Sequence, residues 1–324
     1  MHNGGSTSDG NMPLLYEAFV ETLPPALRGV ARELPWHLKL VADRSAGWSE
    51  VFPHQLSLGA PQLFAEALPG APLARVREAT LAHLLCVLEA AVLERCCVDR
   101  AQLDSEVSAV LEALAGARAS ALARLGPAAE RAHAMARAET LAALEEERQI
   151  LPEARPVTFE DYRRITRAKA SVSCTATLLL AQLAETGQRE SRIIHRALGN
   201  AWHAIQFERD VLCWERDWRT GSAWVVPLVR GIRSRRRNGE RATEPDLVRR
   251  AVLGSGVLEM LLGMAVSEYR KTRRRACALG AERIWAWAAS REAHLSELLT
   301  CESESAGYVI RLQKLAPWAR EVFR

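Results

Sequence analysis

Two segments of the sequence place polar side chains where they could act together. The first is LGNAWHAIQFERDVLCWERDWRTGSAWVVPL, residues 198–228. On one continuous helix, Gln206, Asp210 and Asp217 fall within a narrow stripe, with His203 beside it, because they are four and then seven residues apart. Carboxylates one and two turns apart are suitable oxygen ligands for Mg²⁺. A solvated stripe of charge on a long helix has the same spacing, so both interpretations stay open.

The second segment is TFEDYRRITRAKASVSCTATLLLAQLAE, residues 158–185. Its first half carries four cations and its second half is small and apolar. Such a helix could bury its apolar half in a core while its cations hold an anion at the mouth of a cavity. The alternative is ordinary solvated helix charge. The cations are Arg163, Arg164, Arg167 and Lys169.

The composition is that of a globular protein with a substantial core, with 324 residues, 48% of them apolar and 25% charged. The 43 basic and 39 acidic side chains nearly balance, so overall charge does not indicate a nucleic-acid partner. Residues 230–250 are rich in arginine, and we interpret them as a connector, a lid or a solvated loop. They lack the motifs and interleaved aromatic residues of a nucleic-acid binder.

The sequence contains no apolar run near the ~20 residues that cross a bilayer, and its first residues lack a signal-peptide core. We therefore expect a cytoplasmic protein without integral membrane association. The seven cysteines are scattered, which favours reduced thiols over a zinc site. His83 and His203 have no partner at metal-binding spacing, which favours histidines of the core or the cavity rim.

The pattern of Ala, Leu, Arg and Glu predicts an all-α protein, with a loose polar tail over residues 1–12 and a single domain over residues 13–324. Thr158 is expected to cap a helix, with Asp161 three residues later. The expected helices are 13–22, 25–34, 54–67, 73–95, 104–124, 128–147, 158–187, 190–218, 245–275, 281–299 and 306–323.

Together, the two polar segments resemble the class I isoprenoid synthase superfamily, which includes trans-prenyl diphosphate synthases, squalene and phytoene synthases, and terpene cyclases. Tyr162, Lys169 and the small residues that follow are similar to the prenyl synthase helix with a Tyr, a Lys-Thr pair and small apolar residues. Gly199, Gln206 and Asp210 are in register with the family's second aspartate-rich helix. RTGSAWVVPL resembles the exit from that helix. The resemblance covers residues 158–228.

The resemblance implies a helical bundle with a central apolar cavity for a prenyl diphosphate and Mg²⁺. Lys169 and one of Arg163, Arg164 or Arg167 would bind the diphosphate, and Gln206 would lie near the reacting carbons. Asp210, helped by Asp217, would bind Mg²⁺. Trp202 and Trp214 would contact cationic carbon through their ring faces, with core packing as the alternative. Related prenyl synthases often pair through long helices, so a homodimer is also considered.

Four departures from the family pattern bear on catalysis. The first metal motif is reduced to Glu94 and Asp99, and Arg209 and Cys213 stand where prenyl synthases have aspartates. Ala170 replaces the threonine after the lysine. A Gly-Lys segment with a following arginine, for a second diphosphate substrate, is missing. Two hypotheses remain: a Mg²⁺-dependent terpene synthase, or a catalytically decayed or partner-dependent scaffold of the same fold.

Overall fold

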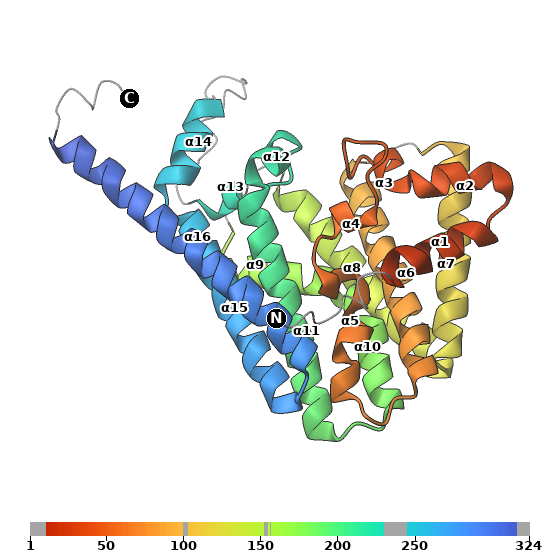
Figure 1. Cartoon of the computed structure of the whole chain (residues 1–324). Helices are drawn as coiled ribbons and strands as arrows, with labels where there is room; N and C mark the ends of the chain where they lie inside the picture. Colours follow the sequence, from red (N-terminus) through yellow and green to blue (C-terminus); the bar gives the residue numbers. More distant parts are fainter. Residues whose placement is uncertain (1–10, 100–102, 152–154, 156, 230–244, 316–324) are drawn as a thin grey trace, which may run out of the picture.

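The computed structural model describes residues 11–99, 103–151, 155, 157–229 and 245–315 (Figure 1). For residues 11–13, 97–99, 245–247, 250 and 301–315 it describes the backbone only. Every regular element in the described ranges is a helix, which confirms the all-α prediction. Most of the expected tail lies outside these ranges, although Asn11 and Met12 already belong to the first helix. The arginine-rich residues 230–244 also lie outside the described residues.

The helices follow one another with short connections. In chain order they are α1 (Asn11–Thr22), α2 (Pro25–Arg32), α3 (Leu34–His37), α4 (Trp48–Val51), α5 (Gln55–Phe64), the 3₁₀ turn η1 (Ala65–Ala67), α6 (Leu73–Asp99), α7 (Ser105–Arg124), α8 (Pro127–Ile150), α9 (Phe159–Lys169), α10 (Ser171–Leu183), α11 (Gln188–Leu212), α12 (Trp214–Arg219), α13 (Val225–Leu228), α14 (Pro245–Gly254), α15 (Val257–Leu279) and α16 (Glu282–Leu315).

The bundle is built around α6, which packs against α5, α7, α8 and α10. Beside this group, α11 packs along α15 and also contacts α9 and α10, and α16 packs along α15. In Figure 1, α15 and α16 form one flank of the molecule and α2 and α7 form the opposite flank. None of the helices in the described part of the chain has the length and apolar character needed to cross a membrane. The bundle thus brings α6, α8, α9 and α11 together near its centre.

The expected helix 158–187 is two helices that meet at Ala170. Thr158 caps the first as predicted, because its hydroxyl oxygen accepts a hydrogen bond from the backbone N–H of Asp161 at 3.0 Å. At the junction, Oγ1 of Thr140 from α8 lies 3.2 Å from the Ala168 carbonyl oxygen and 3.4 Å from the Val172 nitrogen. In a continuous helix those two backbone groups would bond each other. A side chain from another helix therefore interrupts the helical ladder.

The expected helix 190–218 is also interrupted. It breaks at Cys213, whose φ and ψ are −110° and 3°. Asp217 consequently lies on α12 and does not continue the stripe of Gln206 and Asp210 on α11. The prediction that one helix carries all three polar side chains is therefore wrong. The two helices expected over 281–299 and 306–323 are instead joined in α16, and residues 316–323 lie outside the described part.

The expected helix 245–275 is divided into α14 and α15 at a glycine. Gly256 has a φ of 75°, in the left-handed region that favours glycine. The backbone thus leaves the helical conformation there and starts a new helix at Val257.

A proline shapes the helix that lies along α6. Pro61 has no backbone N–H, so the Ser57 carbonyl oxygen one turn earlier lacks its helical donor. Nε2 of His83 lies 3.1 Å from that oxygen, and His83 is fully buried on α6. Burial lowers the pKa of His83 to about 4, so its ring is neutral near pH 7. This contact agrees with the expectation of a core histidine.

We expect the Thr140 hydroxyl to be required at the junction of α9 and α10. Thr140→Val keeps the shape of the side chain but leaves buried backbone groups unsatisfied, which should lower the free energy of unfolding by about 1–3 kcal/mol. Thr140→Ser, which keeps the hydroxyl, should lose less. Urea unfolding followed by circular dichroism measures both, and equal losses in the two variants would contradict the role of the hydroxyl.

Candidate functional site

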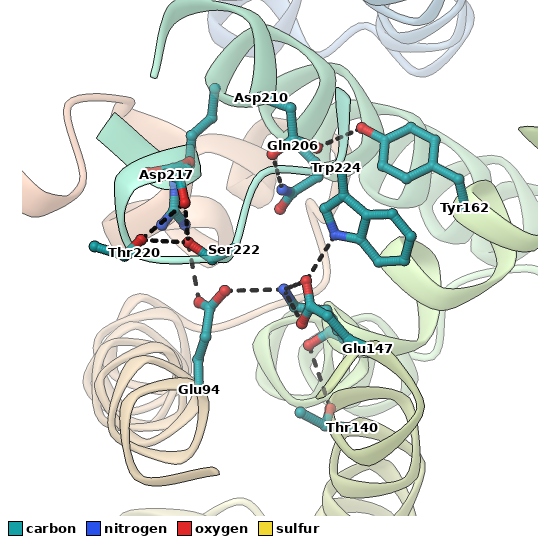
Figure 2. A network of polar contacts seen from close by, with 12 residues as sticks. Glu94, Thr140, Glu147, Tyr162, Gln206, Asp210, Asp217, Thr220, Ser222 and Trp224 are labelled. Carbon is teal, nitrogen blue, oxygen red and sulfur yellow. Dashed lines mark hydrogen bonds and ion pairs between the residues drawn. The ribbon is translucent and has the colours of Figure 1, made fainter. Parts of the chain in front are cut away.

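The centre of the bundle holds a lysine between two glutamates (Figure 2). Lys169 is the last residue of α9, and its Nζ lies 2.9 Å from Glu94 Oε1 on α6 and 2.7 Å from Glu147 Oε2 on α8. The indole N–H of Trp224 donates to Glu147 Oε1 at 2.6 Å. Lys169 was predicted to bind a diphosphate. In this structure its charge is already compensated by protein carboxylates.

Burial and neighbouring charges shift the pKa values of Lys169 and Glu94 in opposite directions. Burial disfavours the charged form of Lys169, yet the adjacent Glu147 and Glu94 raise its pKa above the ordinary value. Burial also opposes ionisation of Glu94, but Lys169 and Arg209 lower the pKa of Glu94 to about 2. Burial raises the pKa of Glu147, against the effect of Lys169. The ammonium and at least one carboxylate are therefore charged near neutral pH.

A second polar group joins α9 and α11, directly beside the first (Figure 2). The hydroxyl of Tyr162 donates to Asp210 Oδ2 at 2.5 Å, and the side-chain amide of Gln206 donates to Asp210 Oδ1 at 2.8 Å. Asp210 is only 6% exposed. Burial raises its pKa to about 7, even though the hydrogen bond from Tyr162 acts in the other direction. Both carboxylate oxygens thus already have protein donors.

The predicted hollow between the Lys169 and Asp210 helices exists, but it is small. It has a volume of about 100 Å³. Glu94, Lys169, Gln206 and Trp202 contribute to its wall. The indole nitrogen of Trp202 is buried without a hydrogen-bond partner. The hollow is below the ~300 Å³ at which ligand pockets usually begin, so a prenyl chain does not fit in this conformation.

The three arginines of α9 do not line this hollow. Arg163 pairs with Glu268 on α15 at 3.3 Å, and Arg164 pairs with Glu146 on α8 at 2.5 Å. Arg167 is exposed and borders a different surface depression, between α8, α10 and α11. Of the four cations predicted to bind a diphosphate, Lys169 alone contributes to the wall of the central hollow.

The predicted metal ligands are not gathered around one point. Asp217 on α12 pairs with Arg216 at 3.1 Å, and the side chain of Asp99 lies outside the described residues. Glu94 faces Lys169 and also Arg209, whose Nη1 lies 3.8 Å from Glu94 Oε2. Among the described side chains, no three His, Cys, Asp or Glu residues are arranged so that they could hold a metal ion.

Mg²⁺ therefore does not fit the donor arrangement of the described residues. Mg²⁺ requires near-octahedral oxygen ligands and is usually held through carboxylates and waters. Here Lys169 and Arg209 occupy the space beside Glu94, and Asp210 is committed to Tyr162 and Gln206. Positive charge beside these acidic groups is supplied by side chains of the protein itself.

Two further residues complete the centre: Glu147, which the sequence did not indicate, and Trp224, one of several tryptophans expected to contact cationic carbon or to pack in the core. Glu147 lies within the run LEEERQ of α8, where no spacing distinguishes it from its less buried neighbours Glu145 and Glu146. Trp224 is almost fully buried, and its ring is tilted against that of Tyr162 with centroids 5.1 Å apart. Trp214, predicted to line the cavity, is instead stacked on Trp218 and does not contribute to the central wall.

We expect Asp210 to make the stability of the protein depend on pH. The folded carboxyl keeps its proton up to about pH 7, whereas the unfolded carboxyl loses it above about pH 3.8. The contribution of Asp210 to the free energy of unfolding is therefore fully present below pH ~4, and it is lost as the pH rises to about 7. Asp210→Asn stays uncharged, so relative to wild type it should gain about 2–4 kcal/mol between pH 5 and pH 8.

Urea unfolding at several pH values measures this difference. Tyr162→Phe serves as a second variant, because removing the donor should move the loss to higher pH. If the free energies of unfolding of wild type and Asp210→Asn changed with pH in parallel, the raised pKa of Asp210 would be contradicted.

We also expect Lys169 to hold the centre together. Lys169→Met leaves Glu94 and Glu147 without their buried cation and should cost about 3–5 kcal/mol. Adding Glu147→Gln, which keeps an oxygen for the Trp224 N–H, should recover part of that loss. A double-mutant cycle by urea unfolding separates the coupling from the single effects. Additive losses would show that Lys169 and Glu147 are not coupled.

Comparison with known proteins gives a match in fold. No protein-family model matches the sequence, and no curated protein matches it at a significant level. Among solved structures, a decaprenyl diphosphate synthase from Rhodobacter capsulatus is similar, with a TM-score of 0.55 and 14% sequence identity. The match covers 88% of this chain and 99% of that chain. The chain therefore has a helical fold like that of a trans-prenyl diphosphate synthase, as the resemblance in its sequence implies.

Proposed function

We propose that the protein is a catalytically decayed or partner-dependent, prenyl synthase-like helical scaffold. The observation that carries this proposal is the pairing of Lys169 with Glu94 and Glu147. An anionic substrate would have to displace both carboxylates from a buried ammonium group. Removing those partners is unfavourable, because they compensate the cost of burying the charge.

The arrangement of the predicted metal ligands supports the same proposal. Ionising an allylic diphosphate requires strong positive charge beside the departing pyrophosphate, which Mg²⁺ supplies in class I enzymes. In this chain Arg209 stands at an aspartate position of that pattern, and its charge is directed toward Glu94. A fixed guanidinium can hold two helices together, but it cannot bind and release with a substrate as a metal ion does.

One observation favours the second candidate, a Mg²⁺-dependent terpene synthase. Lys169, Gln206 and Trp202 contribute to one hollow, and Asp210 is hydrogen-bonded to Gln206 at its edge. These are the residues for which the resemblance implies diphosphate binding, substrate contact and metal binding. Opening of the hollow by substrate and metal would be needed for catalysis, because its volume is about 100 Å³.

Release of pyrophosphate distinguishes the two candidates. The purified protein is incubated with geranyl, farnesyl or geranylgeranyl diphosphate and Mg²⁺, and pyrophosphate is measured. We expect no release above the rate without protein, because the cation and carboxylates of the centre are already paired. Release that is lost in Asp210→Asn, while the variant stays folded, would overturn the scaffold proposal and support the terpene synthase.

A further inference from the structure

An apolar space beside the N-terminal helices lies outside the centre. It has a volume of about 550 Å³ and lies between α1, α4, α5 and the start of α16. Tyr16, Trp48 and Phe52 form an aromatic wall, and Leu58, Leu63 and Leu84 form the aliphatic wall. We call this space the N-terminal cavity. Its volume falls within the ~300–1,000 Å³ of small-molecule sites.

The N-terminal cavity has charged residues at its edge, but their charges are balanced within the protein. Arg32 pairs with Glu21 at 2.6 Å and also with Glu17, and Arg283 pairs with Glu66 at 3.2 Å. An anionic ligand would meet carboxylates beside each of these guanidinium groups. Charge balance therefore favours a ligand without net charge.

One end of the N-terminal cavity is polar and buried. His54 lines the cavity and its Nε2 lies 3.9 Å from Glu208 Oε2. Glu208 also accepts a hydrogen bond from the Tyr269 hydroxyl at 2.7 Å and pairs with Arg291. The Trp287 ring meets the His54 ring edge-on, with centroids 6.3 Å apart. The cavity thus joins an apolar wall to the His54 ring, with Ser49, Gln55 and Gln62 as further polar side chains of its lining.

We propose that the N-terminal cavity binds an uncharged long-chain alcohol, with its hydroxyl group at His54 and its chain against the aromatic and aliphatic walls. A fifteen-carbon isoprenoid alcohol or a straight-chain alcohol of similar length is a small molecule of the kind that a cavity of about 550 Å³ holds. The site shares Phe52 with the hollow at Lys169 but does not depend on whether that centre is catalytic.

The experiment uses the full chain without Mg²⁺ or turnover, so its result is independent of the pyrophosphate assay. The fluorescent neutral probe N-phenyl-1-naphthylamine is bound to the protein and displaced with farnesol, hexadecanol or farnesyl diphosphate. We expect both alcohols to displace the probe and farnesyl diphosphate to be at least tenfold weaker. Displacement by neither alcohol, or tighter binding of the diphosphate, would overturn the proposal.

Two variants locate the binding. Gln62 borders the cavity and is only half-buried, so Gln62→Trp fills space without disturbing the core. This variant should weaken the binding of farnesol at least tenfold. Gln188→Trp, at an exposed position of α11, should leave the binding of farnesol unchanged. His54→Phe should remove the preference for farnesol over the hydrocarbon farnesene. Unchanged farnesol binding in a folded Gln62→Trp variant would place the ligand elsewhere and overturn the proposal.

Discussion

An ammonium group removed from water is stable only when anions surround it, and this constraint organises the centre of the bundle. Lys169 meets it with Glu94 from α6 and Glu147 from α8, at 2.9 and 2.7 Å. Three helices must keep their positions for both contacts to persist. The break at Ala170 ends α9 at the lysine, and Thr140 satisfies the backbone groups that this break exposes. A local interruption of one helix is thus coupled to the electrostatics of the whole centre.

The same constraint bears on the role of α11. Asp210 lies next to a charged pair, yet its pKa is raised to about 7 because burial outweighs the hydrogen bond from Tyr162. A carboxyl that is uncharged for much of the time is a weak ligand for a hard cation. Arg209, one residue earlier on α11, directs a permanent positive charge toward Glu94. In the proposed scaffold, the fixed charges of side chains thus take the place of metal ions that would bind and be released.

The parts of this arrangement that local sequence determines were predictable. The Thr158 cap and the all-α fold depend on capping and periodicity, whereas the proximity of the Lys169 helix to the Gln206 helix was expected from the family resemblance. The breaks at Ala170 and Cys213 were not, because neither residue is a proline or a glycine. The first break depends on Thr140, thirty residues away in sequence. Glu147 was missed for a similar reason, since only the packing of α8 distinguishes it from Glu145 and Glu146.

The two cavities share one wall, and this links the closed centre to the apolar space beside it. Phe52 contributes both to the hollow at Lys169 and to the N-terminal cavity, and its ring is stacked on Trp48 with centroids 6.1 Å apart. Moving this ring toward one cavity would enlarge the other, because a packed interior has little spare volume. Phe52 therefore ties the shape of the central hollow to the shape of the N-terminal cavity.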